Sequence, residues 1–289
     1  MAITLGTPDG AGLSAAVGAL RDWQDEGAPM QLHPGDLGWF WRFGADTTAA
    51  AVRTWSRDGR ILAVGLLDGP GLLRMTIAPD ARQDEELARR VVADVADPER
   101  DVLTPGAANI EAPMDALLQQ MLAEHGWCGD EPWTPLRRDL RGEPVKESEL
   151  RIEVVGAERV AERVAVQRAA FENSTFSQEH WQAMAAGEMY ADARCLIAYD
   201  DRSAAVAAVT VWSAGPGKPG LVEPMGVHRD HRGRGYGKAI TEAAAAALQK
   251  LGSSSAIVAT ASSNVAGVAT YKAAGFEARP EIRDMHREA

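Results

Sequence analysis

A glycine-spaced basic turn, which joins a short apolar segment to an alanine-rich stretch, is the feature that most constrains this chain. The apolar segment runs from Leu221 to Val227, and residues 238–248 have the strongest helix propensity in the sequence. Glycine stands at 233, 235 and 237 between them. Glycine adopts dihedrals that other residues avoid and leaves the backbone open to a ligand. The succession predicts a strand, a turn and a helix.

The turn is also basic, which indicates an anionic ligand. Arg232, Arg234 and Lys238 add positive charge where the first N–H groups of a helix and its dipole already attract anions. A phosphate or pyrophosphate suits such a site. A P-loop would need glycine at 232 and Ser or Thr at 239, and a dinucleotide fingerprint would need glycine at 238 or 240. The sequence has neither, and a glycine-rich turn without a ligand is the alternative for this stretch alone.

A second pattern follows from Asn264 to Phe276: Asn-Val-Ala-Gly-Val-Ala-Thr-Tyr-Lys-Ala-Ala-Gly-Phe. Asn264 suits the N-cap of a helix and Gly275 its end. Asn264 and Tyr271 are separated by nearly two helical turns, so we expect them on one face.

Together the two patterns resemble the GNAT superfamily of N-acyltransferases. Arg232-x-x-Gly235-x-Gly237 is similar to its coenzyme A pyrophosphate loop, and the second pattern to N-x-x-A-x-x-L-Y-x-x-x-G-F. The chain departs from the second at Gly267 and Thr270. The resemblance implies acetyl-CoA as cofactor, and a sheet in which strands 221–227 and 255–261 splay apart to admit the pantetheine arm.

The resemblance and the chemistry of acyl transfer assign roles to single residues. Tyr271 is expected to protonate the leaving thiolate, because its usual pKa of about 10 exceeds the thiol's of about 8.5. Glu223 is expected to take the proton of the amine, and it shares a face with Val227 if the strand is regular. His228 or a water chain is the alternative base. Cofactor contacts are expected from Met225, Gly226, Val227, Arg232, Gly233, Arg234, Gly235, Tyr236, Gly237, Lys238, Asn264 and Tyr271.

The acceptor is expected to be a small molecule with a primary amine, such as a basic antibiotic or an amino-containing metabolite. In the superfamily the segment corresponding to 173–184 lines the acceptor pocket. Acceptor candidates are therefore Glu179, His180, Trp181, Tyr190 and Glu223. Packing or surface roles are the alternative for each of them. Two rival functions stay open: a coenzyme A-binding regulatory protein without turnover, and an enzyme that resembles mycothiol synthase or transfers a longer acyl chain.

The chain also contains an internal repeat. The series Gly226-Val227…Arg232 moved back by 150 residues falls on Thr76-Ile77…Arg82, and the second pattern moved back by 149 places Gly275-Phe276 on Gly126-Trp127. The first copy has Gln83-Asp-Glu-Glu-Leu where the second has Gly-Arg-Gly-Tyr-Gly, and Leu122 where the second has Tyr271. Bulky acidic side chains would repel a pyrophosphate, so the first copy is predicted to bind no cofactor.

The predicted fold is α/β (α+β), with two tandem GNAT-like domains, each a mixed, mostly antiparallel sheet flanked by helices. The predicted domains are 1–140 and 150–289, joined by a polar linker at 141–149. Local patterns predict a helix at 13–23, an aromatic strand at 37–43 that could instead be a ligand wall, and a closing strand at 278–287 of the second sheet.

Composition excludes several functions. A net charge of −11 argues against a nucleic-acid partner and suits a cationic acceptor. The absence of a long apolar stretch and of a basic leader predicts a cytoplasmic protein without a membrane partner. The protein is expected to be a monomer or homodimer. Cys128 and Cys195 are expected to be buried thiols, and His228 with His231 lacks the third ligand of a metal site, so no metal is expected. Five lysines among 30 basic residues indicate a GC-rich bacterial genome.

Overall fold

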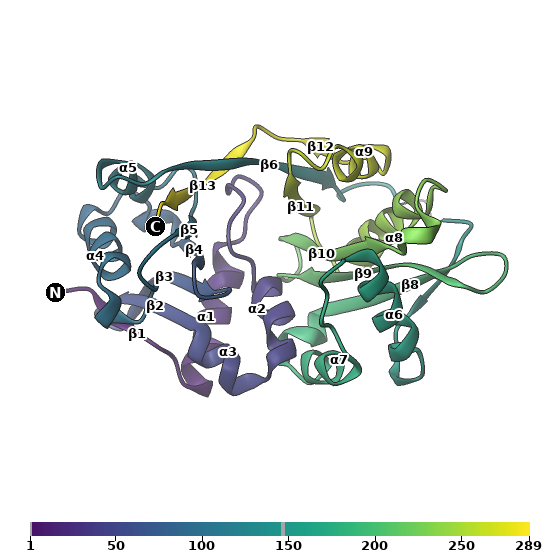
Figure 1. Ribbon diagram of the computed structural model, residues 1–289, viewed down its shortest axis with the longest axis horizontal. Helices are drawn as coiled ribbons and strands as arrows, with labels where there is room; N and C mark the ends of the chain where they lie inside the picture. The colour runs from purple at the N-terminus through teal and green to yellow at the C-terminus, as the bar shows by residue number, and fades with distance from the viewer. Residues whose placement is uncertain (1, 146–147) are drawn as a thin grey trace. The chain divides into compact units, whose positions relative to one another are not determined.

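A computed structural model describes residues 2–145 and 148–289 of the protein (Figure 1). The chain divides into two compact units, the first formed by Met1–Leu37, Ala45–Trp133 and Glu281–Ala289, the second by Gly38–Gly44 and Thr134–Pro280. The predicted domains 1–140 and 150–289 therefore differ from the units at 38–44, 134–140 and 281–289. The predicted linker 141–149 has no helix or strand in its described part, and its residues 146–147 lie outside the described residues.

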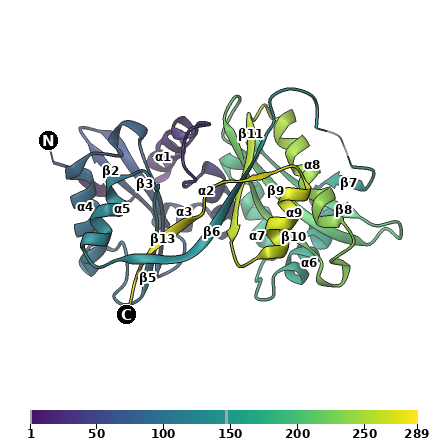
Figure 2. The ribbon, with the colours of Figure 1, turned by 90° about the horizontal axis from the view of Figure 1, so that it is seen from above.

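The first unit is a mixed, mostly antiparallel sheet with helices on its faces. Its strands lie in the order β1-β2-β3-β4-β5-β13-β6, and only the β4–β5 pair is parallel. Figure 2 shows α1 on one side of β2 and β3, and α4 and α5 on the other. The helices are α1 (Gly10–Trp23), α2 (Pro34–Phe40), which runs on into the second unit, α3 (Ala45–Ala51), α4 (Glu85–Ala96) and α5 (Leu117–Glu124). The strands are β1 (Thr4–Gly6), β2 (Val52–Arg57), β3 (Arg60–Leu67), β4 (Leu72–Ile77), β5 (Ala108–Glu111), β6 (Cys128–Asp139), of which the part from Thr134 onward belongs to the second unit, and β13 (Ile282–Arg287).

The second unit has the same kind of sheet. β7 to β10 are antiparallel neighbours, β11 pairs in parallel with β10, and β12 pairs with β6. Figure 1 shows α8 and α9 on one face of β8–β10 and α6 and α7 on the other. The strands are β7 (Arg151–Val154), β8 (Ala193–Tyr199), β9 (Ala205–Ser213), β10 (Pro219–Val227), β11 (Ser255–Ala261) and β12 (Glu277–Ala278). The helices are α6 (Val160–Ala170), α7 (Gln178–Ala185), α8 (Tyr236–Lys250) and α9 (Val265–Ala273).

The two units repeat one succession of elements. Three antiparallel strands (β2–β4 or β8–β10) lead into a 3-10 turn, at Pro79–Ala81 or Arg229–His231, and then into a helix, α4 or α8. A strand parallel to the third strand and a further helix follow in both. The fold class predicted from the sequence is thus confirmed, as is the tandem repeat.

Two local predictions were wrong. Residues 37–43 form the end of α2 and a 3-10 turn at Trp41–Phe43, where a strand was expected. Pro34 favours the first helical position, and the carboxylate of Asp36 accepts a hydrogen bond from the backbone N–H of His33 at 2.6 Å, so the start of the helix overrides the strand propensity of the aromatic residues. Of the segment 278–287, β13 pairs with β5 in the first unit, so it does not close the second sheet.

A group of charged side chains surrounds the C-terminal strand in the first unit. The guanidinium of Arg74 lies 2.7 Å from the carboxylate of Glu111 and 3.0 Å from that of Asp36. Asp284, on β13, is partly buried next to them. Burial, and then the negative charge of Glu111, raises the pKa of Asp284 to about 7. This carboxyl is therefore half protonated near neutral pH.

Two further expectations concern cysteine and membranes. Cys195 is buried, as expected, but Cys128 is exposed near the start of β6, so the prediction of two buried thiols was wrong for it. No helix within residues 2–145 and 148–289 has the length and apolar character needed to cross a membrane.

Candidate functional site

The site is built around the divergence of β10 and β11. The two strands pair only where Pro219–Leu221 lies opposite Ser255–Ile257, although β10 continues to Val227 and β11 to Ala261. From Met225 to Val227, the partner of β10 within the described part of the chain is β9. The predicted splay of strands 221–227 and 255–261 is present. A strand that has lost one neighbour can pair with an extended ligand.

A β-bulge interrupts β10 where the strands part. Val222 lies opposite Val211 and Met225 opposite Val209, so β10 has one more residue than β9 between these pairs. Glu223 lies in this bulge, and its carbonyl accepts a hydrogen bond of 2.7 Å from the indole N–H of Trp212. In a regular strand Glu223 would lie on the same face as Val227. The extra residue breaks this alternation, because Val222 and Met225 both pack with Val227 toward the core.

Tyr271 and Glu223 influence each other electrostatically. Tyr271 lies on α9 and is only 6% exposed, with its ring 5.7 Å from that of Phe276. Burial raises the pKa of Tyr271, and the charge of Glu223 raises it further. The hydroxyl of Tyr271 therefore keeps its proton at neutral pH beside a carboxylate.

The glycine-spaced turn forms an open N-terminus for α8. Gly233 (φ +75°) and Gly235 (φ +85°) adopt left-handed dihedrals, and a Cβ at either position would have no atom within 4 Å. Gly235 is the N-cap and provides no side-chain hydrogen bond. The N–H of Ala239 donates to the carbonyl of Gly235, so the N–H groups of residues 236–238 have no acceptor inside the helix. Such an end fits a pyrophosphate.

Gly237 has a different reason to be glycine. A Cβ there would lie 2.9 Å from Cγ2 of Thr270 and 3.4 Å from Cγ2 of Val227, so its absence lets α8 approach α9. At Gly267 a Cβ would lie 2.4 Å from Nδ2 of Asn264, the residue that caps α9 by accepting from the N–H of Gly267 at 3.1 Å. Both departures from the family pattern, Gly267 and Thr270, therefore take part in close local packing.

The basic side chains of the turn divide into two groups. Arg234 and Lys238 are exposed at the start of α8, and Lys238 lies 3.4 Å from Glu242 one turn further on. Arg232 donates from Nη2 to the carbonyl of Ala170 at 2.8 Å, and Arg229 binds the end of α6 in the same way. Arg232, for which a cofactor contact was predicted, is thus bonded to the end of α6.

The remaining predicted cofactor residues contribute mainly backbone. Met225, Val227 and Tyr236 pack against the hydrophobic core of the second unit, and Gly226 faces the end of α6, where a Cβ would lie 2.6 Å from that of Ala170. Their backbone N–H and C=O groups are therefore the parts that a cofactor would meet.

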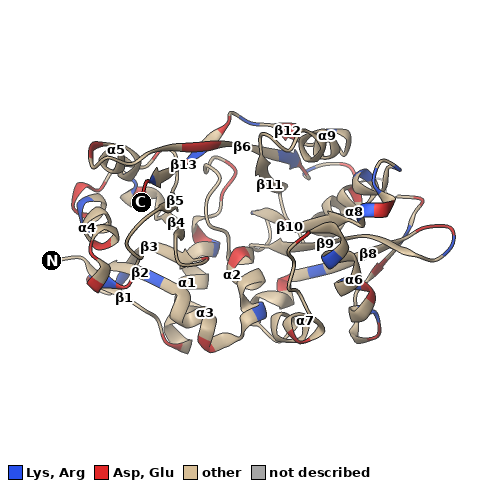
Figure 3. Ribbon diagram, viewed as in Figure 1, with Lys and Arg blue, Asp and Glu red and all other residues tan. Residues whose placement is uncertain are grey.

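The matching position in the first unit is closed by a carboxylate. Asp84 is the N-cap of α4 and accepts from the N–H of Leu87 at 2.9 Å, while Arg57 lies 2.7 Å from its other oxygen. Glu85 and Glu86 follow in the first turn, and Figure 3 marks acidic residues on α4 in red. The protein's own negative charge thus occupies the helix end that a pyrophosphate would need.

The predicted acceptor residues fall into two groups on and after α7. The ring of Trp181 lies 6.0 Å from that of Tyr190, and Tyr190 lies 6.1 Å from Trp212, which binds the backbone of Glu223. His180 instead contacts the rings of Phe43 and Phe176, and Glu179 is exposed at the start of α7, where it accepts from Ser177. The structure therefore links Trp181, Tyr190 and Glu223, and leaves Glu179 and His180 outside that link.

Trp212 and the segment Gly38–Gly44 were missed as parts of the site. The segment belongs to the second unit: Trp39 stacks on Phe176 with ring centroids 5.1 Å apart, and Gly38 lies directly against the ring of Trp212. The aromatic run at 37–43 was a signal for it, as a ligand wall was the alternative there. The indole hydrogen bond of Trp212 left no trace in the sequence.

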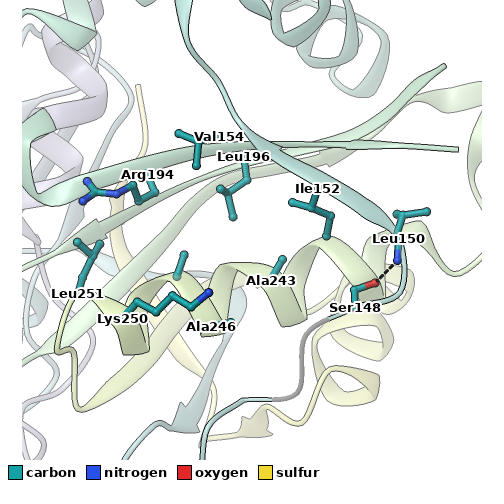
Figure 4. Close-up of a pocket in the computed structure, with 11 residues that line it drawn as sticks. Ser148, Leu150, Ile152, Val154, Arg194, Leu196, Ala243, Ala246, Lys250 and Leu251 are labelled. Atoms are coloured by element: carbon teal, nitrogen blue, oxygen red, sulfur yellow. Dashed lines mark hydrogen bonds between the residues drawn. The ribbon is translucent and has the colours of Figure 1, made fainter. Parts of the chain in front are cut away.

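A separate cavity of about 320 Å³ lies between β7, β8 and α8 (Figure 4). Aliphatic side chains form most of its lining, with Arg194 and Lys250 as the charged members. None of the predicted site residues is among its described lining residues, and these include no carboxylate, imidazole or phenol for proton transfer. The lining residues are Ser148, Leu150, Ile152, Val154, Arg194, Leu196, Ala243, Ala246, Ala247, Lys250 and Leu251. Within the described residues there is also no cluster of three His, Cys, Asp or Glu side chains that could hold a metal ion.

Comparison with known proteins identifies a matching family model and similar folds. The model of the acetyltransferase (GNAT) family matches residues 161–276. No curated protein matches the chain.

Similar solved structures include a GCN5-related N-acetyltransferase from Sphaerobacter thermophilus, with 16% identity, a TM-score of 0.62 and coverage of 99% of this chain and 95% of that one. A tandem GNAT protein from the clavulanic acid biosynthesis pathway has 18% identity, a TM-score of 0.63 and coverage of 99% and 98%. A GNAT-family acetyltransferase from Colwellia psychrerythraea has 16% identity, a TM-score of 0.60 and coverage of 100% of both chains. At these identities the likeness establishes the fold over both units.

Proposed function

Because the chain belongs to the GNAT acetyltransferase family through residues 161–276, we propose that it transfers an acetyl group from acetyl-CoA to a primary amine of a small molecule. The observation that carries this proposal is the combination of an uncapped helix end at Gly235, a gap beyond Leu221 between β10 and β11, and the Tyr271–Glu223 pair. The first unit has a capped helix end and Leu122 in place of the tyrosine. The second unit alone therefore carries the reaction.

The cofactor is bound mainly by backbone groups of the second unit. The free N–H groups of residues 236–238, with Arg234 and Lys238 nearby, hold the pyrophosphate. The edge of β10 at 225–227 pairs with the pantetheine arm, and its N–H groups stabilise negative charge on the thioester oxygen. Pro224 has no N–H, so this role falls to the residues after it. When bound, acetyl-CoA supplies the activated acetyl group.

Two side chains move the protons. Glu223 takes a proton from the ammonium of the acceptor, directly or through a water, because only the neutral amine has a lone pair for attack. The amine nitrogen forms the new bond to the acetyl carbon as the carbon–sulfur bond breaks. Tyr271 gives its proton to the departing thiolate, and its raised pKa means that it donates only as charge develops on sulfur. The nitrogen loses its second proton as the amide forms, and this proton passes, directly or through solvent, to the phenolate of Tyr271.

The acceptor is proposed to be a cationic small molecule bound beside Glu223, where Trp181 and Tyr190 provide aromatic surface. Aromatic faces and a carboxylate attract an ammonium group, and a chain of net charge −11 attracts a polycationic amine over longer distances. A basic antibiotic or an amino-containing metabolite has this chemistry.

The test is to incubate the purified protein with acetyl-CoA and a panel of amines and to measure released thiol. The panel holds aminoglycosides, polyamines, amino sugars and amino acids, and Tyr271→Phe is run beside the wild type. Release that depends on an amine and falls in Tyr271→Phe supports the proposal. Tight binding of coenzyme A by calorimetry, without release for any amine, would instead indicate a coenzyme A-binding regulatory protein.

A further inference from the structure

The bulge that contains Glu223 is held by a side chain from the neighbouring strand. Glu223 lies between the pairs Val222–Val211 and Met225–Val209, where the register of β10 against β9 shifts. A bulged residue takes its direction from whatever fixes its backbone. A hydrogen bond of 2.7 Å from Nε1 of Trp212 to the carbonyl oxygen of Glu223 contributes to fixing this backbone. This is the length of a strong N–H···O hydrogen bond.

The ring of Trp212 is itself fixed from two sides. It is 1% exposed and meets the ring of Tyr190 edge to face, with centroids 6.1 Å apart and an interplanar angle of 76°. On the other side a Cβ at Gly38 would lie 2.4 Å from its Cζ3 and 2.7 Å from its Cε3. Gly38 has an ordinary negative φ, so its backbone does not require glycine. The ring of Trp212 does.

We propose that Trp212 is a positioning residue for the acyl-transfer reaction, which holds Glu223 beside Tyr271 through its backbone, and that Gly38 from the first half of the sequence keeps the indole in place. Through Trp212, these contacts connect Gly38 with Glu223, which lies 185 positions further along the chain. Its consequence is specific: a change at Trp212 or Gly38 alters the proton transfer that Glu223 performs and leaves the pyrophosphate site at Gly235 untouched. This inference rests on the function proposed above.

The experiment compares Trp212→Phe with the wild type in the thiol-release assay, at saturating acetyl-CoA and across pH. Phenylalanine keeps an aromatic ring but removes the N–H donor together with one of the two rings of the buried indole, a loss of packing that the control variant below shares. We expect kcat to fall on the order of tenfold to a hundredfold, as for a catalytic group displaced by about an ångström, with KM for acetyl-CoA unchanged. Because the carboxylate no longer lies in reach of the amine, the loss is largest near neutral pH and shrinks at high pH, where the amine is already neutral.

Two further variants keep the test decisive. Trp55→Phe is the matched control, since Trp55 also donates a buried indole hydrogen bond, to Asp94 at 2.9 Å in the first unit, and it should lower stability without this kinetic signature. Gly38→Ala keeps the N–H of Trp212 but displaces its ring, so it should show the same loss of kcat. It takes the place of Trp212→Phe in the test if that variant folds poorly.

The outcomes separate the two proposals. One outcome is that the wild type is active and that Trp212→Phe and Gly38→Ala have the same kcat and pH profile as Trp55→Phe. This outcome would overturn the positioning role and leave the acetyltransferase proposal standing. If the wild type binds coenzyme A but none of the amines in the panel causes release of thiol, both proposals are overturned.

Discussion

The sharpest test of the cofactor loop is to give the second repeat the acidic residue of the first. Sliding the second repeat back by 150 residues places Gly235 on Glu85, so the substitution is Gly235→Glu. Two costs follow from the structure. Gly235 has φ +85°, where a residue with a Cβ is strained by about 1–2 kcal/mol, although a Cβ itself would have open space. The second cost is electrostatic.

The electrostatic cost falls on binding alone. A carboxylate at the start of α8 would face the anion held by the first helical N–H groups, and two like charges about 4 Å apart cost about 1 kcal/mol in water and more near a protein surface. The carboxylate also competes for the same N–H groups, as Asp84 does in the first unit. With two phosphate charges the total is about 3 kcal/mol, or roughly a hundredfold loss of affinity for coenzyme A.

Calorimetric titration with coenzyme A measures this loss, and Gly217→Glu is the matched control. Gly217 also has a left-handed backbone, at φ +75°, and open space around its missing Cβ, but it lies in the turn between β9 and β10. Both variants should unfold at similarly lowered temperatures, whereas only Gly235→Glu should lose affinity. Equal affinities in the two variants would refute the assignment of the loop.

Three further predictions concern single side chains. Tyr271→Phe should lower kcat about a hundredfold or more with little change in KM for acetyl-CoA, because the thiolate leaves without its proton; steady-state kinetics that match the wild type would remove Tyr271 from the reaction. Glu223→Gln should lower the rate most near neutral pH and recover at high pH, where free amine no longer needs a base; an unchanged pH–rate profile would reject Glu223. The pKa of Asp284 is about 7 when folded and about 3.9 when unfolded, so the folded state binds the extra proton, and stability from this group falls as pH rises from about 4 to 7. Asp284→Asn should therefore raise the free energy of unfolding by about 1–2 kcal/mol at pH 8, after allowance for partial exposure, and by little at pH 4; equal gains at both pH values in urea titrations would contradict this.

The sequence predicted those features that neighbouring residues encode. The left-handed glycines at 233 and 235, the cap at Asn264 and the end of α9 at Gly275 depend on dihedrals and hydrogen bonds within a few residues, and the structure has each of them. The repeat was predictable for the same reason, since two local patterns recur at nearly one offset. Residues 37–43 were mispredicted because aromatic residues favour strands, whereas a helix start at Pro34 decides this segment.

The features that sequence reasoning missed depend on partners far away in the chain. The pairing of β13 with β5 joins Met285 to Ile110, and no local pattern distinguishes this partner from a strand of the second sheet. The bulge at Glu223 is a matter of register between β9 and β10, which alternation alone does not reveal. The indole of Trp212 could be assigned to the site only once that register was known, because its bond is to a backbone carbonyl.

These distant partners show that segments before residue 150 form part of the second unit. The second unit takes in Gly38–Gly44 and the part of β6 from Thr134 onward, so it is not the product of residues 150–289 alone. Leu136 and Leu140, both preceding residue 150, are 1% and 4% exposed in its hydrophobic core, beside Tyr271 and Phe276. Removing two buried leucines costs several kcal/mol, a large fraction of the stability of a domain. The first half of the sequence thus supplies part of the core on which Tyr271 rests, and through Gly38 part of the support of Glu223, while its own helix end is closed to phosphate by Asp84.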